Sequence, residues 1–423
     1  MRALVRRFDA RYAWVVVAAA FVVLMISAAS RSTPGVLLVP IETDMHWSRE
    51  QTSLAVSVGI ALYGLMGPFA AAMIQRFGLR LIVPGALVLM AIASASTTYV
   101  TQAWQLVVTW GLISGIGTGT IASVFAATIA GQWFRKRRGL AVGFLTASVQ
   151  SGQLVFLPIL AHTAETAGWR TASWIVSAAA IAVIPVIWLF VPERPAAVGI
   201  APYGGTHVEP EAPSKGNPIV NAVRMLGKAS RVPRFWLLAG SFFVCGLSTN
   251  GLIGTHLIAL CQDHGLPEVR AAWLLAAMGV FDLIGTTASG WLSDRYNNWV
   301  LLGWYYGLRG LALMFLPFSD FGGVQLGAFA VFYGLDWIAT VPPTVRLTTE
   351  AFGEKDGPVV YGWIATGHQI GAAVAAFGAG LVRTEFESYL AALLVAGMAC
   401  VIAAATLGGA AIATRRQPAL AAE

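Results

Sequence analysis

Four charged side chains lie inside long apolar stretches of the sequence: Arg31, Asp282, Arg309 and Asp336. A charge at the centre of a membrane costs about 2.5–3.5 kcal/mol on insertion scales, so it needs a partner or a wet cavity. Two of these side chains are positive and two are negative, which permits pairing. Charges of this kind mark either a path for ions and substrates or a structural ion pair.

Arg31 stands in the segment ISAASRSTPG, at residues 26–35. The small, polar and proline residues around it would loosen a helix and leave backbone groups that need partners beside a cavity or packed protein. An arginine stays charged at any working pH, so it can hold an anion but cannot carry a proton. The alternatives are a salt bridge in a gate or an arginine that reaches the outer interface.

Arg309 is too central in its apolar span to reach an interface, and we expect it to form a structural ion pair with Asp336 or Asp282. Asp336 also shares a polar helical face with Tyr333, so a role in proton coupling stays open. If Arg309 and Asp336 neutralise each other, Arg31 and Asp282 remain as an unlike pair facing the path. Asp282 would then carry the proton, because a buried carboxyl can be protonated at working pH.

Neutral polar residues inside the spans complete the predicted substrate-binding set. Gln150 and Gln153 share one helical face and suit either a carboxylate or interhelical hydrogen bonds. The full predicted set is Arg31, Gln150, Gln153, Asn250, Tyr333 and His368. For His368 the alternative is a hydrogen bond to a neighbouring helix. His256, nearer the end of its span, suits a gate or packing role.

The composition predicts what must position these residues. The chain has 423 residues, of which 57% are hydrophobic and only 11% charged; soluble domains carry about 25% charged residues. Apolar windows of about 20 residues predict twelve membrane helices, near 13–40, 51–74, 81–99, 104–130, 138–161, 169–191, 235–260, 268–292, 299–318, 322–346, 358–382 and 387–412. The fold class is therefore an all-α membrane protein with two bundles of six helices, at 1–192 and 234–423, joined by a polar linker at 193–233.

The positive charges predict the orientation. Of the 27 lysines and arginines, 21 fall in segments on the side of the N-terminus, four on the other side and two within spans. This split follows the positive-inside rule and places both termini in the cytoplasm. The net charge of +7 is thus explained by topology, and we expect no nucleic-acid partner.

A short motif occurs twice, after the second and the eighth predicted spans. The first copy is AAMIQRFGLR and the second is GWLSDRYNN. Both sit between the second and third helices of a half, which indicates two related halves arranged in parallel. The residues assigned to gating in these loops are Arg76, Gly78, Arg80, Asp294 and Arg295.

The two loops resemble the GxxxDRxGxR motif of the major facilitator superfamily, with Gln75 in place of the first aspartate. Within that superfamily, WFRKRRGLAVGFLTAS resembles a signature of the monocarboxylate transporters and their bacterial oxalate–formate exchanger-like branch. The matches are Phe134, Lys136, Arg137, Arg138, Leu140, Ala141 and Gly143, with a weaker second match at Asp9, Tyr12, Ala13 and Trp14. The resemblance implies that Arg31 falls within one residue of an anion-binding lysine of helix 1. Thr286 stands where the family has an arginine one turn after its aspartate, here Asp282.

The resemblance implies a secondary transporter of a small organic anion, monocarboxylate-like and proton-coupled, that works by alternating access. Its partners would be the anion, a proton and the bilayer. The chain would be a monomer in the inner (plasma) membrane. Alternatives are proton-coupled efflux of hydrophobic compounds and a membrane ligand sensor without transport. The sequence carries no ATP-binding, nucleophile or metal-ligand motif, so we expect no enzyme activity, cofactor or metal.

Overall fold

The computed structural model describes the backbone of residues 11–205, 207 and 218–420. The side chains at 68, 122–123, 149–150, 218, 354–355 and 413–420 lie outside the description. Within these described residues, eleven helices are long and apolar enough to cross a membrane. Arg49–Gly67 and Phe69–Phe77, bent by 53° at Pro68, together make a twelfth span, so the twelve predicted spans are confirmed.

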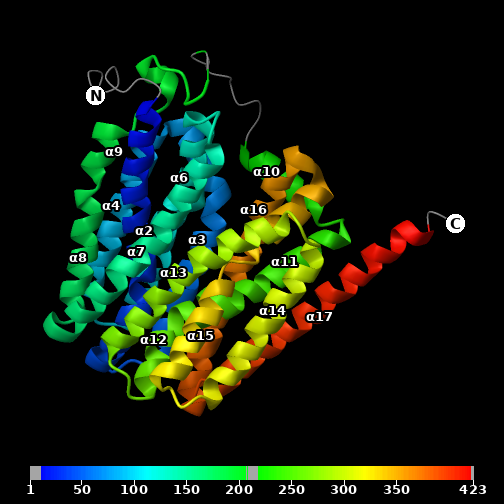
Figure 1. Ribbon diagram of the computed structural model, residues 1–423. Coiled ribbons are helices and arrows are strands. Elements are labelled where there is room, and N and C mark those ends of the chain that lie inside the picture. The colour runs from blue at the N-terminus through cyan, green and yellow to red at the C-terminus, as the bar shows by residue number, and fades with distance from the viewer. Residues whose placement is uncertain (1–10, 206, 208–217, 421–423) are drawn as a thin grey trace.

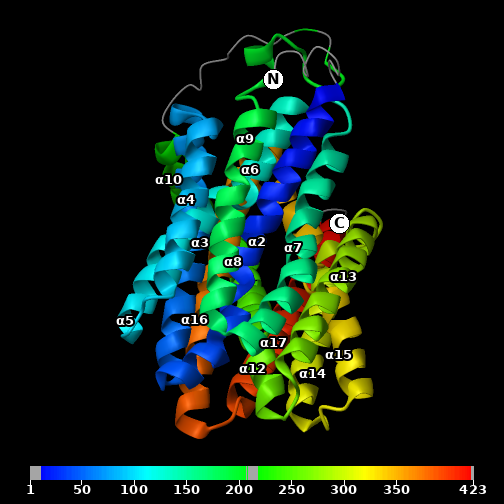
Figure 2. The ribbon, with the colours of Figure 1, turned by 90° about the vertical axis from the view of Figure 1, so that its left-hand side faces the viewer.

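The first six spans form what we call the N half. They are α2 (Tyr12–Met45), α3 (Arg49–Phe77), α4 (Leu79–Thr97), the unit α5 (Ala103–Leu106), η2 (Val107–Ser114) and α6 (Gly115–Trp133), then α7 (Arg138–Ala167), and α8 (Trp169–Ala182) with α9 (Ile184–Phe190). Helices α2 and α7 are apolar on all sides, as expected of helices surrounded by lipid and other helices. Helices α2 and α7 pack along each other, as Figure 2 shows.

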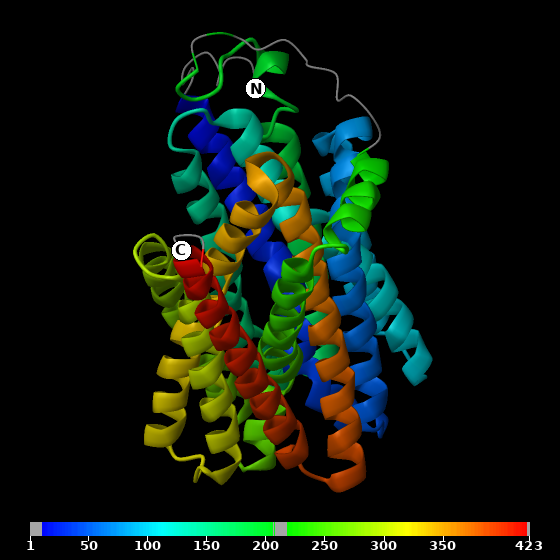
Figure 3. The ribbon, with the colours of Figure 1, turned by 90° about the vertical axis from the view of Figure 1, so that its right-hand side faces the viewer.

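The last six spans form what we call the C half. They are the unit α11 (Pro233–Gly246), η4 (Leu247–Ile253) and α12 (Gly254–Asp263), then α13 (Glu268–Ser293), α14 (Asn298–Phe315), α15 (Gly323–Asp336) continued by the start of α16 (Val341–Phe386), the rest of α16, and α17 (Leu390–Leu420). A non-helical residue, Gly353, separates the two parts of α16. Helix α17 packs along α14, as Figure 3 shows.

The two ends of the molecule differ in the segments that they carry. The linker end carries the segment between α9 and α11, with the short helix α10 (Pro218–Ala229), at the top of Figure 1. The closed end carries the α2–α3 and α16–α17 connections, at the bottom of Figure 1. Helix α10 contacts α3 of the N half and α16 of the C half, so it bridges the halves at the linker end.

Glycines allow α3 and the fourth span to cross closely. A Cβ on Gly115 would lie 2.8 Å from the Gly59 carbonyl oxygen, and one on Gly119 would lie 2.8 Å from the Tyr63 backbone. Together with Gly111, these residues form the spacing of small residues that brings helix backbones together.

Candidate functional site

A cavity lies between the halves, near the middle of the helices. Both halves line it. The lining residues are Ser30, Arg31, Ser32, Pro34, Gly35, Val56, Gly59, Ile60, Tyr63, Trp110, Ser114, Gly115, Thr118, Gln153 and Leu157 from the N half, and Asn250, Gly254, Thr255, Leu275, Trp337 and Gln369 from the C half.

Arg31 is the one charged residue among the described residues that line this cavity. It is half-buried in α2, and its guanidinium lies over the ring of Tyr63 at 5.4 Å from the centroid. A cation–π contact of this kind holds a guanidinium in place without neutralising it. The cavity can therefore offer one fixed positive charge to a ligand.

Amide side chains from three helices surround this charge. Gln153 of α7, Asn250 of η4 and Gln369 of α16 all line the cavity. The Oε1 atom of Gln369 is buried and has no hydrogen-bond partner in the structure, which leaves it available to a ligand. Gln150 is helical, but its side chain lies outside the described residues.

Two other predicted binding residues lie elsewhere. The Tyr333 hydroxyl is buried and donates a hydrogen bond to the Ser248 carbonyl oxygen at 2.8 Å. The ring of His368 packs on Phe242, with centroids 4.9 Å apart, while its neighbour Gln369 faces the cavity. Consecutive helical residues point about 100° apart, so the choice between His368 and Gln369 depended on a rotation that the sequence does not display.

Sequence reasoning missed the aromatic lining of Tyr63, Trp110 and Trp337. One feature of the sequence could have indicated Trp110: it lies in the fourth span, which has few polar residues, next to the glycines that pack closely. Trp110 lies in η2 of the fourth span, and Asn250 lies in η4 of the seventh span; both segments are π-helical turns, one in each half. Such turns occur often at functional sites because they rotate the side chains that follow.

The tenth span is broken between Asp336 and Val341, beside the cavity. The Nε atom of Arg309 lies 2.7 Å from Oδ2 of Asp336, in a buried ion pair. The guanidinium also donates to the carbonyl oxygens of Asp336 at 2.5 Å and Trp337 at 3.2 Å. Arg309 thus satisfies carbonyls that the broken helix leaves open.

Asp282 of α13 also forms hydrogen bonds at this break in the tenth span. Its Oδ1 atom accepts hydrogen bonds from the Ile338 backbone N–H and the Thr286 hydroxyl, both at 2.9 Å. Asp282 is 3% exposed, and the cavity is lined by Trp337, the residue before Ile338. The structure therefore connects Asp282 to the cavity through the backbone at Trp337, rather than placing the carboxylate in the lining beside Arg31.

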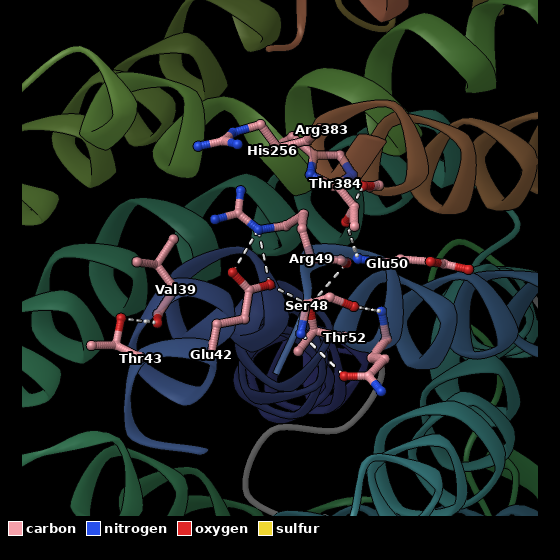
Figure 4. A network of polar contacts seen from close by, with 12 residues as sticks. Val39, Glu42, Thr43, Ser48, Arg49, Glu50, Thr52, His256, Arg383 and Thr384 are labelled. Atoms are coloured by element: carbon pink, nitrogen blue, oxygen red, sulfur yellow. Dashed lines mark hydrogen bonds and ion pairs between the residues drawn. The ribbon is translucent and has the colours of Figure 1, made fainter. Parts of the chain in front are cut away.

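A network of polar side chains joins the halves at the closed end, shown in Figure 4. Arg49 donates through Nε to both carboxylate oxygens of Glu42, at 2.7 and 2.8 Å. Its Nη1 atom donates to the Tyr389 hydroxyl of the C half. The same hydroxyl lies 3.0 Å from Nδ1 of His256, and the Glu50 backbone N–H donates to the Thr384 hydroxyl at 3.0 Å.

Cross-half contacts continue inward from this network as far as the cavity. The Ser57 hydroxyl donates to the Ala373 carbonyl oxygen at 2.8 Å, and the Thr366 hydroxyl to the Gly64 carbonyl oxygen at 3.4 Å. A Cβ on Gly35 would lie 3.0 Å from the Gly254 carbonyl oxygen. The halves are thus packed together between the cavity and the closed end.

The predicted gating loops lie at the linker end, with Arg76, Asp294 and Arg295 exposed. Asp294 pairs with Arg346 at 2.5 Å, and Arg80 donates to the Trp188 carbonyl oxygen at 2.5 Å. Each of these contacts stays within one half.

Gly78 has a φ of +88°, which favours glycine. A Cβ there would lie 2.7 Å from Oε1 of Glu193, whose carboxylate accepts from the backbone N–H groups of Leu79 and Arg80 at the start of α4. Glu193, from the linker, thus supplies a negative charge at the first loop, where Gln75 has none.

Twelve candidate membrane spans in two halves around a central cavity are an arrangement found in transport proteins. A family model described as Major Facilitator Superfamily matches residues 20–376. The chain belongs to this superfamily.

Relatives extend over nearly the whole chain. The chain is 25% identical over 389 residues to the uncharacterized MFS-type transporter YcxA of Bacillus subtilis, covering 91% of each chain. It is 26% identical over 394 residues to monocarboxylate transporter 13 of Rattus norvegicus, covering 92% of this chain and 86% of the relative.

Solved structures share the fold. A bacterial homolog of the human lysosomal transporter Spinster, inward-facing and unoccupied, matches with a TM-score of 0.71 at 17% identity, covering 95% of this chain and 96% of that one. The occupied form of that homolog gives a TM-score of 0.73 at 16% identity. The protein is a multi-pass membrane protein of a transporter family.

Proposed function

We propose that this protein is a secondary transporter of a small organic anion that carries a single carboxylate. The observation that carries the proposal is Arg31, a lone positive charge in a cavity lined by both halves. One fixed guanidinium matches one carboxylate, while the second charge of a dianion would meet no further cation among the described residues of the lining. The relatives named monocarboxylate transporters support the same class.

In this proposal, the anion crosses the membrane by alternating access. Contacts between the halves run from the closed end to the cavity, whereas the loop contacts at the linker end stay within each half. We infer an inward-facing arrangement, in which the anion reaches Arg31 from the linker end. Rocking of one half against the other would break the closed-end network and expose the same site to the other side.

Orientation gives a direct test. We place the termini and the linker in the cytoplasm of a bacterial cell, on the distribution of arginine and lysine. Single cysteines at two exposed positions, Arg231 and Glu385, should label differently with a membrane-impermeant maleimide in intact cells. Glu385→Cys should react at once, and Arg231→Cys only after permeabilisation. Immediate labelling at Arg231 would reverse the orientation.

Proton coupling is assigned to Asp282. Protonation would weaken its acceptance of the Ile338 N–H, and the backbone at Trp337 would relay that change to the cavity. Asp336 is paired with Arg309 and is assigned to the scaffold. Proton and anion would then bind in mutual support, because each favours the same arrangement of the broken helix.

Asp282→Asn should lose accumulation driven by a proton gradient and keep exchange of anion for anion. Asparagine retains an acceptor oxygen for Ile338 and Thr286 but cannot take up a proton. The measurement is uptake of labelled anion into proteoliposomes, with and without an imposed gradient. Asp320→Asn, at an exposed loop position, is the control and should behave as wild type. Full gradient-driven accumulation in Asp282→Asn would remove Asp282 from the coupling.

A further inference from the structure

In the closed-end network, the partners of each group decide which atom donates and which accepts each hydrogen bond. Nε2 of His256 lies 2.8 Å from the Ala376 carbonyl oxygen. A carbonyl oxygen can only accept, so Nε2 carries the proton of a neutral imidazole. Nδ1 is then an acceptor, and it receives the Tyr389 O–H at 3.0 Å. The Tyr389 oxygen in turn accepts from Arg49.

This arrangement of donors and acceptors is possible only while His256 is neutral. The imidazole is 1% exposed, and burial raises the pKa of Tyr389, so the hydroxyl stays protonated and donates. A proton added at Nδ1 would make both ring nitrogens donors. The Tyr389 hydroxyl would then lose its acceptor and face a second positive group.

The charges around His256 decide which contact of the network would break if His256 were protonated. Arg49 is held by Glu42 in the N half, with both side chains about 10% exposed. Tyr389 and His256 belong to the C half. Other charged groups lie nearby. Asp263 of α12 pairs with Arg383 of α16 at 2.7 Å. Glu268 of α13 accepts from the Gln262 amide at 3.3 Å, and the carboxylate of Glu165 on α7 acts on it as a like charge.

An imidazolium would repel Arg49 across Tyr389, and Glu42 would keep Arg49 in the N half. The link between Arg49 and Tyr389, which crosses between the halves, is therefore the one that breaks. Other cross-half hydrogen bonds at this end run from the Glu50 backbone N–H to the Thr384 hydroxyl and from the Val269 backbone N–H to Oε1 of Glu165, and neither involves His256 or Tyr389.

We propose that His256 is a proton-binding site whose occupation opens the closed end of the transporter. The site is separate from the cavity and from Asp282. A proton arriving at His256 from the closed-end side opens that side, so acidity there promotes exposure of the cavity. The inference concerns access alone, and its test needs no knowledge of the transported anion.

The reporter is a cysteine at Ser53, which is fully buried in α3 under the closed-end network. Purified full-length protein in nanodiscs is treated with a water-soluble maleimide at pH 7.5 and pH 5.5. Rates are divided by those of Glu385→Cys, an exposed position, which removes the pH dependence of the thiol itself. Protein without an introduced cysteine gives the background from the three buried native cysteines.

Acidification should raise the normalised labelling rate at Ser53→Cys by about fivefold or more in the presence of His256. With His256→Gln the rate should stay low at both pH values, because glutamine can accept from Tyr389 and donate to Ala376 but does not titrate. His264→Gln, at an exposed position directly after the same helix, should keep the response to pH.

A variant that opens the end without a proton completes the design. Tyr389→Phe removes the hydroxyl that connects Arg49 to His256, so labelling at Ser53 should already be fast at pH 7.5. An equal pH response in His256 and His256→Gln proteins would overturn the proposal. So would slow, pH-independent labelling with His256 in place.

Discussion

Arg31→Gln should raise the dissociation constant for a monocarboxylate by at least about 25-fold, because losing one partner of a buried charge pair costs about 2 kcal/mol or more. Arg31 is the single charged residue among the described residues lining the cavity, so no neighbouring cation there can replace it. Arg31→Lys should keep part of the affinity, since the charge remains while the planar fork is lost.

Equilibrium binding of labelled anion to purified protein measures this effect. Arg170→Gln is the matched control, because Arg170 is exposed and pairs with Asp44 at the closed end, 2.6 Å away. It should bind the anion as wild type does. Undiminished affinity in Arg31→Gln would return Arg31 to a gating or interfacial role.

Arg309→Leu should lower the free energy of unfolding by about 3–5 kcal/mol, because it leaves Asp336 buried without its partner. The second Asp336 oxygen, Oδ1, already has no hydrogen-bond partner, so nothing nearby is placed to compensate. The double variant Arg309→Leu with Asp336→Leu should recover much of the loss, since a buried pair can be exchanged for apolar side chains at small cost.

Reversible unfolding in mixed micelles, followed by far-ultraviolet circular dichroism, gives the two free energies. Recovery in the double variant should stay incomplete, because the carbonyl oxygens of Asp336 and Trp337 also lose their donor. Arg295→Leu, an exposed arginine stacked on Trp291, should change stability by no more than about 0.5 kcal/mol. Equal losses in single and double variants would show that the pairing contributes nothing to the scaffold.

The sequence predicts the membrane spans well because each of them must be apolar over its whole length. It also singles out Arg31 and Arg309, since an arginine in an apolar span is rare enough to be noticed without a structure. The charge balance among four residues suggested the arrangement that the structure has for Arg309 and Asp336.

The sequence predicts poorly how each helix is rotated about its axis and where a helix is broken. Trp337 reaches the cavity because the tenth span is broken there, and Asp282 acts on that break through Ile338. No periodic pattern marks either fact. Gln369 rather than its neighbour His368 lines the cavity for the same kind of reason, because a shift of one residue changes the face.

The closed-end network escaped notice because its members lie at the ends of spans, where polar residues are ordinary. Glu42 and Arg49 are close in the sequence, whereas their partners His256 and Tyr389 lie far along the chain in the C half. Their burial and their contacts, which only the folded structure brings together, distinguish them from solvated residues.

Counterflow in proteoliposomes tests the central claim most directly. Vesicles loaded with an unlabelled monocarboxylate and diluted into a trace of the labelled anion should accumulate label transiently with the wild-type protein. Arg31→Gln should accumulate none, while Arg31→Lys should give a reduced overshoot. If no member of a panel of monocarboxylates exchanges, or if Arg31→Gln exchanges as fast as wild type, transport of an anion bound at Arg31 is contradicted.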